Sequence, residues 1–252
     1  MAVKTNIFTE LPKLELHAHL NGSLSAVTLQ ELIELQKSTA EYGDAKYNVW
    51  EAVIQNGSKR TLQECFQVFG IAHALTSNPV AVYKATQNVI KEYADDGVIY
   101  LELRSTPRAV QGVMTRTDYI KAIIDAINET KRNDILVKLL VSIDRRQEKE
   151  AAEEIVEIAL SAKQQYPHII AGIDLSGDPS KGMISDFLPL LERARNAGLS
   201  ISIHCAEIPN PEEVEKILEF KPDRLGHCTC VHPLCGGTEQ LWHKLLDLQI
   251  PV

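Results

Sequence analysis

An alternation of apolar strand-like runs and helix-like segments constrains the fold of this chain most strongly. The runs cover 98–104, 136–144, 169–175, 199–204 and 224–227, and an amphipathic helical segment follows each of them. Crossovers of roughly 25 to 40 residues require parallel strands with helices packed outside the sheet. Runs that are apolar on both faces are typical of a covered parallel sheet. We therefore predict an α/β protein.

Polar side chains end almost every predicted strand: Arg104, Asp144, Asp174, His204 and His227. A (β/α)8 barrel builds its active site from most strand ends, whereas a doubly wound open sheet gathers its site at one crevice. The pattern therefore favours the barrel. Such a barrel requires eight strands, and only about six are expected here. The sequence stops in an apolar run at 248–252, where a seventh strand would begin. We predict one barrel domain over 1–252 that lacks its C-terminal strands and helices.

Three helices are predicted before the alternation begins. Ser23 or Ser25 can cap the first, and its apolar face comprises Val27, Leu29, Leu32, Ile33 and Leu35. A capping box at Thr61–Glu64 opens the second, which stops at 76–79, and the third runs from 80 to 96 before Gly97. Residues 37–59 between the first two are polar and irregular.

Two histidines lie two residues apart in the run 14–21. Strand side chains alternate between faces, so His17 and His19 share one face and can bind one divalent ion. The pair alone does not distinguish a metal site from ordinary histidines. The segments His204-Cys205-Ala206-Glu207 and Leu225-Gly226-His227-Cys228 favour the metal, because each also brings titratable groups to a strand end. A catalytic site further needs a third ligand and an open position.

The composition narrows the class of protein. Hydrophobic residues make up 44% and charged residues 24% of the chain, as in ordinary globular proteins, and the net charge is −8. This charge argues against general binding to nucleic acid. With no apolar run long enough for a membrane span and no signal-peptide core, we expect a cytosolic protein that does not bind a membrane.

Cysteine usage agrees with a reducing compartment. Five cysteines, an odd number, indicate thiols rather than a disulfide framework. Three of them, Cys228, Cys230 and Cys235, are interleaved with His227 and His232. This segment lacks the second ligand arm of a structural zinc site, so buried or loop thiols are the preferred interpretation.

Four segments in order resemble the signature segments of the adenosine deaminase family. They are 16–23, 172–178, 204–207 and 224–227, and together they span essentially the whole chain. Segments 8–13 and 101–108 resemble the adenosine deaminase-like branch, whose members act on N6-methyl-AMP. The resemblance implies a metal-dependent hydrolase barrel and a role in nucleotide metabolism.

The resemblance also implies the chemistry. His17, His19 and His204 would bind one zinc ion per chain, and zinc lowers the pKa of water enough to supply hydroxide near neutrality. Glu207 would protonate the purine ring nitrogen next to the carbon that is attacked. His227 would orient the hydroxide and stabilise the developing charge. The products would be IMP and an amine.

Substrate contacts follow from the same branch. It implies a purine nucleoside monophosphate as the substrate, and we expect the chain to be a monomer. Ser105, Thr106, Pro107 and Arg108 suit the phosphate, because arginine pairs with phosphate oxygens in bidentate fashion. The remaining positions that match substrate contacts are His19, Asn21, His73, Asp144 and Gly177.

One part of the family pattern is absent from this sequence. The fourth metal ligand and a neighbouring substrate contact are aspartates that would lie beyond Val252. We therefore expect this chain to be weakly active, unstable or inactive. Two alternatives stay open: deamination of the nucleoside adenosine, and nucleotide binding without turnover.

Other metal-dependent enzymes are less compatible with the sequence. Binuclear hydrolases that share the His-x-His pair bridge their metals with a carboxylated lysine, and 143–145 and 173–175 contain no lysine. The cytidine deaminase type of zinc site needs His-x-Glu and Pro-Cys-x-x-Cys, and neither occurs. A mononuclear site is therefore preferred.

Overall fold

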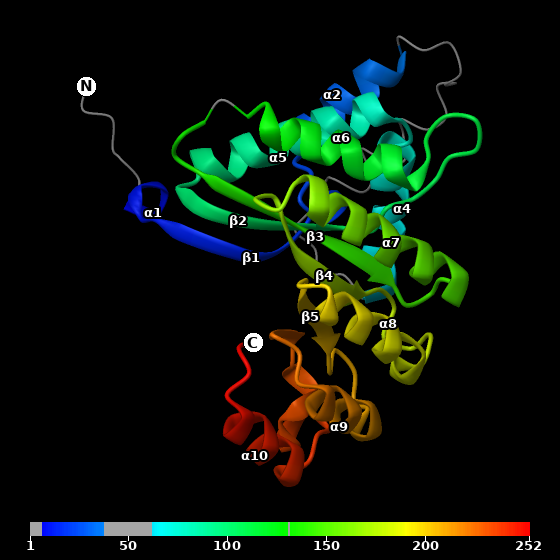
Figure 1. Cartoon of the computed structure of the whole chain (residues 1–252). Coiled ribbons are helices and arrows are strands. Elements are labelled where there is room, and N and C mark those ends of the chain that lie inside the picture. Colours follow the sequence, from blue (N-terminus) through cyan, green and yellow to red (C-terminus); the bar gives the residue numbers. More distant parts are fainter. Residues whose placement is uncertain (1–6, 38–61, 131) are drawn as a thin grey trace. The chain divides into compact units, whose positions relative to one another are not determined.

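The computed structural model describes residues 7–37, 62–130 and 132–252 (Figure 1). Its contacts divide the chain into two compact units. Unit 1 consists of Met1–Leu103 and Arg108–Val137, and unit 2 consists of Arg104–Pro107 and Lys138–Val252. In the part of the chain that is described, no helix is long and apolar enough to cross a membrane.

Unit 1 is mainly helical. Its elements are α1 (Ile7–Glu10), β1 (Lys13–His19), the 3-10 helix η1 (Leu20–Gly22), α2 (Ala26–Lys37), α4 (Leu62–Leu75), α5 (Pro79–Asp95), β2 (Val98–Ser105) and α6 (Arg116–Asn128). β1 and β2 are neighbours in the sheet. The last two residues of β2, Arg104 and Ser105, belong to unit 2.

Local capping sets the helix starts in unit 1. The hydroxyl of Ser25 accepts a hydrogen bond from the Thr28 amide at 3.1 Å, which caps α2 as predicted. Asn78 caps α5 and Pro79 is its first residue. A capping box between Thr115 and Asp118, which the sequence analysis overlooked, starts α6. Thr61, the first residue of the predicted capping box at 61–64, lies outside the described residues. Most of the segment 37–59 also lies outside them.

The core of unit 1 corrects one detail of the predicted apolar face of α2. Leu29, Leu32 and Ile33 are buried against Leu75 and Ala81, whereas Val27 is 67% exposed. Residue 27 precedes Leu29 by two positions, which on an α-helix is about 200° of rotation and the opposite face. The inclusion of Val27 in the buried face was therefore wrong.

Unit 2 repeats the strand–helix pattern. Its elements are β3 (Leu136–Asp144), α7 (Lys149–Gln165), β4 (Ile170–Ser176), α8 (Ile184–Asn196), β5 (Ser200–Cys205), α9 (Pro211–Phe220), β6 (Arg224–His227), the 3-10 helices η3 (Thr229–Val231) and η4 (Pro233–Cys235), and α10 (Glu239–Leu248). Strands β3 to β6 are neighbours in sequence order, and each pair is parallel. The predicted parallel α/β arrangement is confirmed for these strands.

The register of these strands brings polar residues to matching positions. Asp174 on β4 lies between Ser142 on β3 and Ser202 on β5. Nearer the strand ends, Cys205 pairs with His227 of β6. The covering helices α7, α8 and α9 pack side by side against β4 and β5 (Figure 1). The carboxyl ends of β3 to β6 are therefore available for a site at one edge of the sheet, as in other parallel α/β sheets.

Candidate functional site

In unit 2 the ends of β5 and β6 bring three predicted residues together. The rings of His204 and His227 have centroids 5.0 Å apart, and their candidate ligand nitrogens lie within 4.8 Å of one another. Nε2 of His227 is 3.7 Å from Oε2 of Glu207. The predicted catalytic residues Glu207 and His227 and the predicted metal ligand His204 thus form one cluster.

Uncommon backbone conformations surround this cluster. Ala206, His227 and Cys228 have φ values of 54°, 66° and 54°, in the left-handed region that residues other than glycine seldom adopt. The Cys228 amide donates to the Cys205 carbonyl at 2.9 Å and the Cys230 amide to the Ala206 carbonyl at 2.8 Å. Such strain persists only where surrounding contacts enforce it, and it is concentrated at functional sites. No motif in the sequence indicated these conformations.

A buried carboxylate lies behind His204. Oδ1 of Asp174 is 3.3 Å from Nδ1 of His204 and 2.6 Å from Nη1 of Arg104. Ser142 donates to the other carboxylate oxygen at 3.1 Å. The side chains of Arg104 and Asp174 are 1% and 0% exposed, so this ion pair is removed from water. The carboxylate thus places negative charge beside Nδ1, an arrangement that is common for histidines that bind a metal through Nε2.

The environment shifts the pKa values of Glu207 and His227 in opposite directions. Burial raises the pKa of the Glu207 carboxyl above its ordinary value, and electrostatic interactions with His204 and Arg145 oppose this effect. Partial burial lowers the pKa of His227 to about 4, and electrostatic interactions with His204 and Arg104 act in the same direction. His227 is therefore neutral at pH 7, while Glu207 holds a proton more readily than an exposed glutamate.

Two predicted substrate contacts meet at the ends of β3 and β4. Gly177 has a φ of 105°, and a Cβ atom at this position would overlap Oδ1 of Asp144. The guanidinium of Arg146 holds the same carboxylate, with Nε 3.0 Å from each oxygen. Glycine is needed here both for its backbone conformation and for the close approach of Asp144.

The segment predicted to contact phosphate is divided between the units. Ser105, Thr106 and Pro107 belong to unit 2, and Arg108 belongs to unit 1. Ser105 is 4% exposed, whereas Thr106 is half-buried. Thr106 is thus the more accessible of the two hydroxyls.

Unit 1 holds the other predicted residues: His17, His19, Asn21, His73 and Arg108. The rings of His17 and His19 have centroids 5.3 Å apart, in agreement with the expectation that they share a strand face. Directly after them, η1 carries Asn21, whose Oδ1 accepts from the Thr76 hydroxyl and whose Nδ2 donates to the Tyr119 hydroxyl, each at 3.3 Å.

Arg108 is anchored at the end of α4. Its Nη2 donates to the carbonyl oxygens of His73 and Thr76 at 2.6 and 2.5 Å and to the Thr76 hydroxyl at 2.8 Å. Its Cζ lies 5.8 Å from the centroid of the Tyr119 ring. Thr76 and Tyr119 therefore link Asn21 to Arg108. The sequence analysis assigned Thr76 only to a helix stop and Tyr119 to no role, because contacts over such separations leave no local pattern.

The cysteine-rich segment does not form a second metal site among the described residues. Cys205, Cys228, Cys230 and Cys235 are free thiols. Among the described residues, no group of three potential metal ligands includes any of these cysteines. His232 instead packs edge-on against Trp242, with ring centroids 5.0 Å apart. These observations agree with the preferred interpretation of buried and loop thiols.

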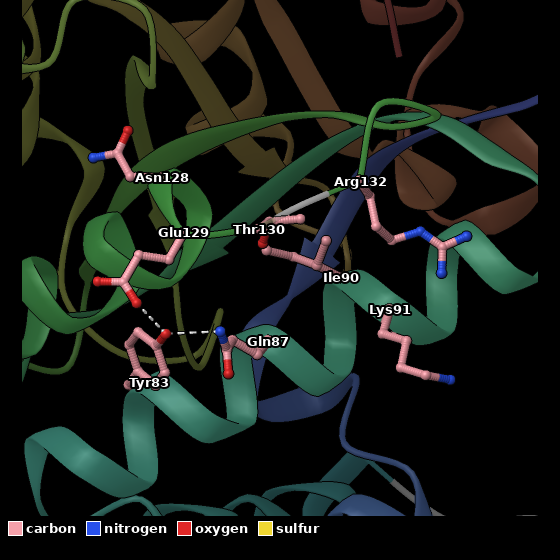
Figure 2. Close-up of a pocket in the computed structure, with 8 residues that line it drawn as sticks. All are labelled: Tyr83, Gln87, Ile90, Lys91, Asn128, Glu129, Thr130 and Arg132. Carbon is pink, nitrogen blue, oxygen red and sulfur yellow. Dashed lines mark hydrogen bonds between the residues drawn. The ribbon is translucent and has the colours of Figure 1, made fainter.

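A cavity in unit 1 lies apart from every predicted residue. It measures about 690 Å³ and lies beside α5 and the end of α6 (Figure 2). Figure 2 shows that its polar groups bond to one another: the Tyr83 hydroxyl donates to Glu129 at 2.5 Å and accepts from Gln87 at 2.7 Å. The lining therefore does not identify a ligand. It consists of Tyr83, Gln87, Ile90, Lys91, Asn128, Glu129, Thr130 and Arg132.

The chain is similar to several known proteins. The adenosine deaminase family profile matches residues 12–251. The N6-methyl-AMP deaminase of Homo sapiens is 43% identical over an alignment of 253 positions, which covers 99% of this chain and 70% of the human protein. The solved structure of Arabidopsis ADAL complexed with IMP has a TM-score of 0.84 at 37% identity and covers 98% of this chain and 71% of that one.

A more distant structure contains a metal. The zinc-bound amidohydrolase from Burkhoderia ambifaria has a TM-score of 0.73 at 25% identity, over 89% of this chain and 60% of that one. Together these likenesses confirm the predicted fold class, an α/β protein of the metal-dependent hydrolase barrel type.

Proposed function

Because the chain belongs to the adenosine deaminase family, we propose that it is a zinc-dependent hydrolase that deaminates N6-methyl-AMP and related N6-substituted AMP to IMP and an amine. The observation that carries this proposal is the cluster of His204, Glu207 and His227 at the ends of β5 and β6. Its substrate assignment is supported by the identity of 43% with the human N6-methyl-AMP deaminase over 99% of the chain.

The proposed metal ligands are His17, His19 and His204. The donor set fits zinc, since imidazole nitrogen is a preferred zinc ligand and three such ligands are common in catalytic sites. The carboxylate of Asp174 next to Nδ1 of His204 supports Nε2 as the ligand atom. When bound, zinc acts as a Lewis acid and lowers the pKa of water.

Glu207 and His227 carry the proton chemistry. Glu207, whose pKa is raised by burial, donates a proton to the purine ring nitrogen as water adds to the adjacent carbon. Neutral His227 orients the attacking water and stabilises the charge that develops on its oxygen. One proton of the attacking water returns to the Glu207 carboxylate. As the bond from the ring carbon to the exocyclic nitrogen breaks, the other proton passes to that nitrogen, so ammonia or methylamine leaves and the carbonyl of IMP forms.

The remaining predicted residues bind the nucleotide. His19, Asn21, His73, Asp144 and Gly177 contact the purine and ribose. The phosphate is contacted by Ser105, Thr106, Pro107 and Arg108. Arg108 donates to it through N–H groups other than those that bond to His73 and Thr76. The proposal takes the chain to be a cytosolic monomer that binds neither nucleic acid nor membrane.

Turnover of three substrates tests this function. The purified chain is incubated with N6-methyl-AMP, AMP and adenosine while the ultraviolet absorbance change from adenine to hypoxanthine is followed. We expect the largest kcat/KM with N6-methyl-AMP and one zinc per chain by elemental analysis. Preference for adenosine would contradict the nucleotide assignment, and IMP binding without turnover would contradict an enzymatic role for this chain.

A matched pair of variants tests the site itself. Glu207→Gln removes the proton donor and is expected to lower kcat by about 10²- to 10⁴-fold while IMP still binds. Glu212→Gln makes the same chemical change on a side chain that is 83% exposed, and we expect its kcat to equal that of the unmodified chain. Equal activity of the two variants would exclude Glu207 from the chemistry.

A further inference from the structure

Arg145 makes a buried ion pair that the catalytic proposal does not use. Its side chain is 4% exposed, and it donates to both carboxylate oxygens of Glu213, at 2.8 and 2.6 Å. Glu213 lies in the first turn of α9, and its amide is capped by Asn210 at 3.2 Å. A charge-assisted bidentate pair of this kind is strong and directional.

The same guanidinium also binds the loop between β4 and α8. Nε of Arg145 donates to the Lys181 carbonyl at 2.6 Å, and Nη2 donates to the Gly182 carbonyl at 3.0 Å. The backbone amide of Arg145 donates to the Ser176 carbonyl at 2.9 Å. One side chain therefore connects three segments: 145–148 after β3, 177–183 after β4, and the start of α9 behind 206–210 after β5.

Each of these segments holds or adjoins a residue of the proposed site. Asp144 directly precedes the first segment, Gly177 begins the second, and Glu207 lies in 206–210, just before α9. The side chain of Arg145 ties the outer part of the second segment and the start of α9 to the first segment, because it reaches Lys181, Gly182 and Glu213 at once.

We propose that Arg145 is a positioning residue, which holds Asp144, Gly177 and Glu207 in the arrangement that binds and deaminates the purine. This inference rests on the proposed function for the identity of the ligand. It requires arginine rather than any cation: Nε, Nη1 and Nη2 all donate, in fixed planar directions, to acceptors on two different segments. Lysine offers a single nitrogen and cannot reach them together.

Arg195 provides a matched control for a merely stabilising role. It also binds one carboxylate, that of Glu192 at 3.0 Å, and two carbonyls, those of Phe220 and Lys221 at 3.1 and 2.9 Å. It joins the C-terminal ends of α8 and α9, next to the start of β5 and β6 rather than their ends. A substitution there loosens the same helices without touching the three segments.

The experiment compares Arg145→Lys, Arg145→Met, the double variant Arg145→Met with Glu213→Leu, and Arg195→Met. The double variant removes the unpaired Glu213 charge that Arg145→Met leaves buried, so it recovers much of the lost thermal stability. Measurements are Tm, IMP affinity by calorimetry, kcat and KM for N6-methyl-AMP, and hydrogen exchange of segments 177–183 and 206–210.

We expect all three Arg145 variants to lose about 100-fold in kcat/KM, because small displacements of catalytic groups have effects of this size. Hydrogen exchange of the two segments should accelerate, and the double variant should regain Tm but neither kcat/KM nor IMP affinity. Arg195→Met should lower Tm, and it should leave kcat/KM and the hydrogen exchange of the two segments unchanged, because Arg195 bonds to none of the three segments.

Recovery of kcat/KM together with Tm in the double variant would overturn the inference, since stability alone would then account for the effect. Unchanged hydrogen exchange in Arg145→Lys would overturn it as well. If the unmodified chain neither binds IMP nor turns over N6-methyl-AMP, the proposed function fails. The hydrogen-exchange comparison with Arg195→Met then still decides whether Arg145 holds the segments.

Discussion

The carboxylate of Asp174 lies 3.3 Å from Nδ1 of His204, and the two side chains are only 0% and 7% exposed. Thirty residues separate them in the chain, yet β4 and β5 are hydrogen-bonded neighbours. Arg104 completes the arrangement from the end of β2, 2.6 Å from the same oxygen of Asp174. This buried ion pair therefore supports the orientation of the histidine proposed to bind zinc.

Asp174→Asn should weaken zinc binding. The amide preserves the shape of the side chain but loses the negative charge behind Nδ1 of His204, and changes of this kind cost about 10- to 100-fold in metal affinity. Competition with a chromophoric chelator measures the affinity, and the visible spectrum of the cobalt-substituted protein reports on the ligand geometry.

Ser142→Ala is the control for Asp174→Asn. It removes only the hydrogen bond to the other oxygen of Asp174, at 3.1 Å. A loss smaller than that of Asp174→Asn is expected. Equal zinc affinity in Asp174→Asn and the unmodified chain would show that the carboxylate does not support the ligand.

Arg104→Met should destabilise the fold itself. It leaves the buried Asp174 carboxylate without its cation, and loss of one partner of a buried ion pair costs about 3–5 kcal/mol in the free energy of unfolding. Arg132→Met removes a bidentate pair with Asp134 and a further ion pair with Asp95. The three side chains are 30%, 57% and 46% exposed, and exposed pairs contribute about 1 kcal/mol or less each.

Urea denaturation of Arg104→Met and Arg132→Met measures this difference in the free energy of unfolding. A loss for Arg104→Met as small as that for Arg132→Met would mean that water reaches Asp174 in solution. The comparison is made on zinc-free protein, because a metal that binds only the folded state would add to the measured stability.

Gly177→Ala should impair both folding and substrate binding. Its left-handed backbone conformation costs a residue with a Cβ about 1–2 kcal/mol. In addition, that Cβ would overlap Oδ1 of Asp144 and displace a proposed substrate contact. We expect IMP affinity to fall by about tenfold or more, which corresponds to about 1.4 kcal/mol of binding free energy.

Gly112→Ala separates these two effects. Gly112 has a φ of 72°, but a Cβ there has no atom within 4 Å. It should therefore lose stability through the backbone alone and keep its affinity for IMP. If Gly177→Ala binds IMP as tightly as Gly112→Ala does, the contact between Gly177 and Asp144 is not part of the site.

The regular elements of unit 2 could be predicted closely from the sequence. The run 136–144 corresponds to the observed strand β3, and the run 224–227 corresponds to β6. Hydrophobic periodicity and caps act over a few residues, so they are visible in the sequence. The same pattern predicted His204 and His227 at the ends of parallel strands, which share one edge of the sheet, whereas the role of Glu207 was predicted from the resemblance to the adenosine deaminase family.

Other features depended on how distant segments pack. The left-handed conformations of Ala206 and His227, the anchoring of Arg108 by Thr76, and the contacts of Arg145 have no signature in the local pattern.

The amino-acid sequence by itself thus determined the order of strands and helices and the titratable groups that end the strands. Each of these features depends on the periodicity of a few neighbouring residues. The pairing of Asp174 with Arg104 and His204, and of Arg145 with Glu213, was decided by tertiary structure. A buried charge without a partner costs a large free energy. Which residue lies close enough to pair with it depends on how distant segments of the chain pack together.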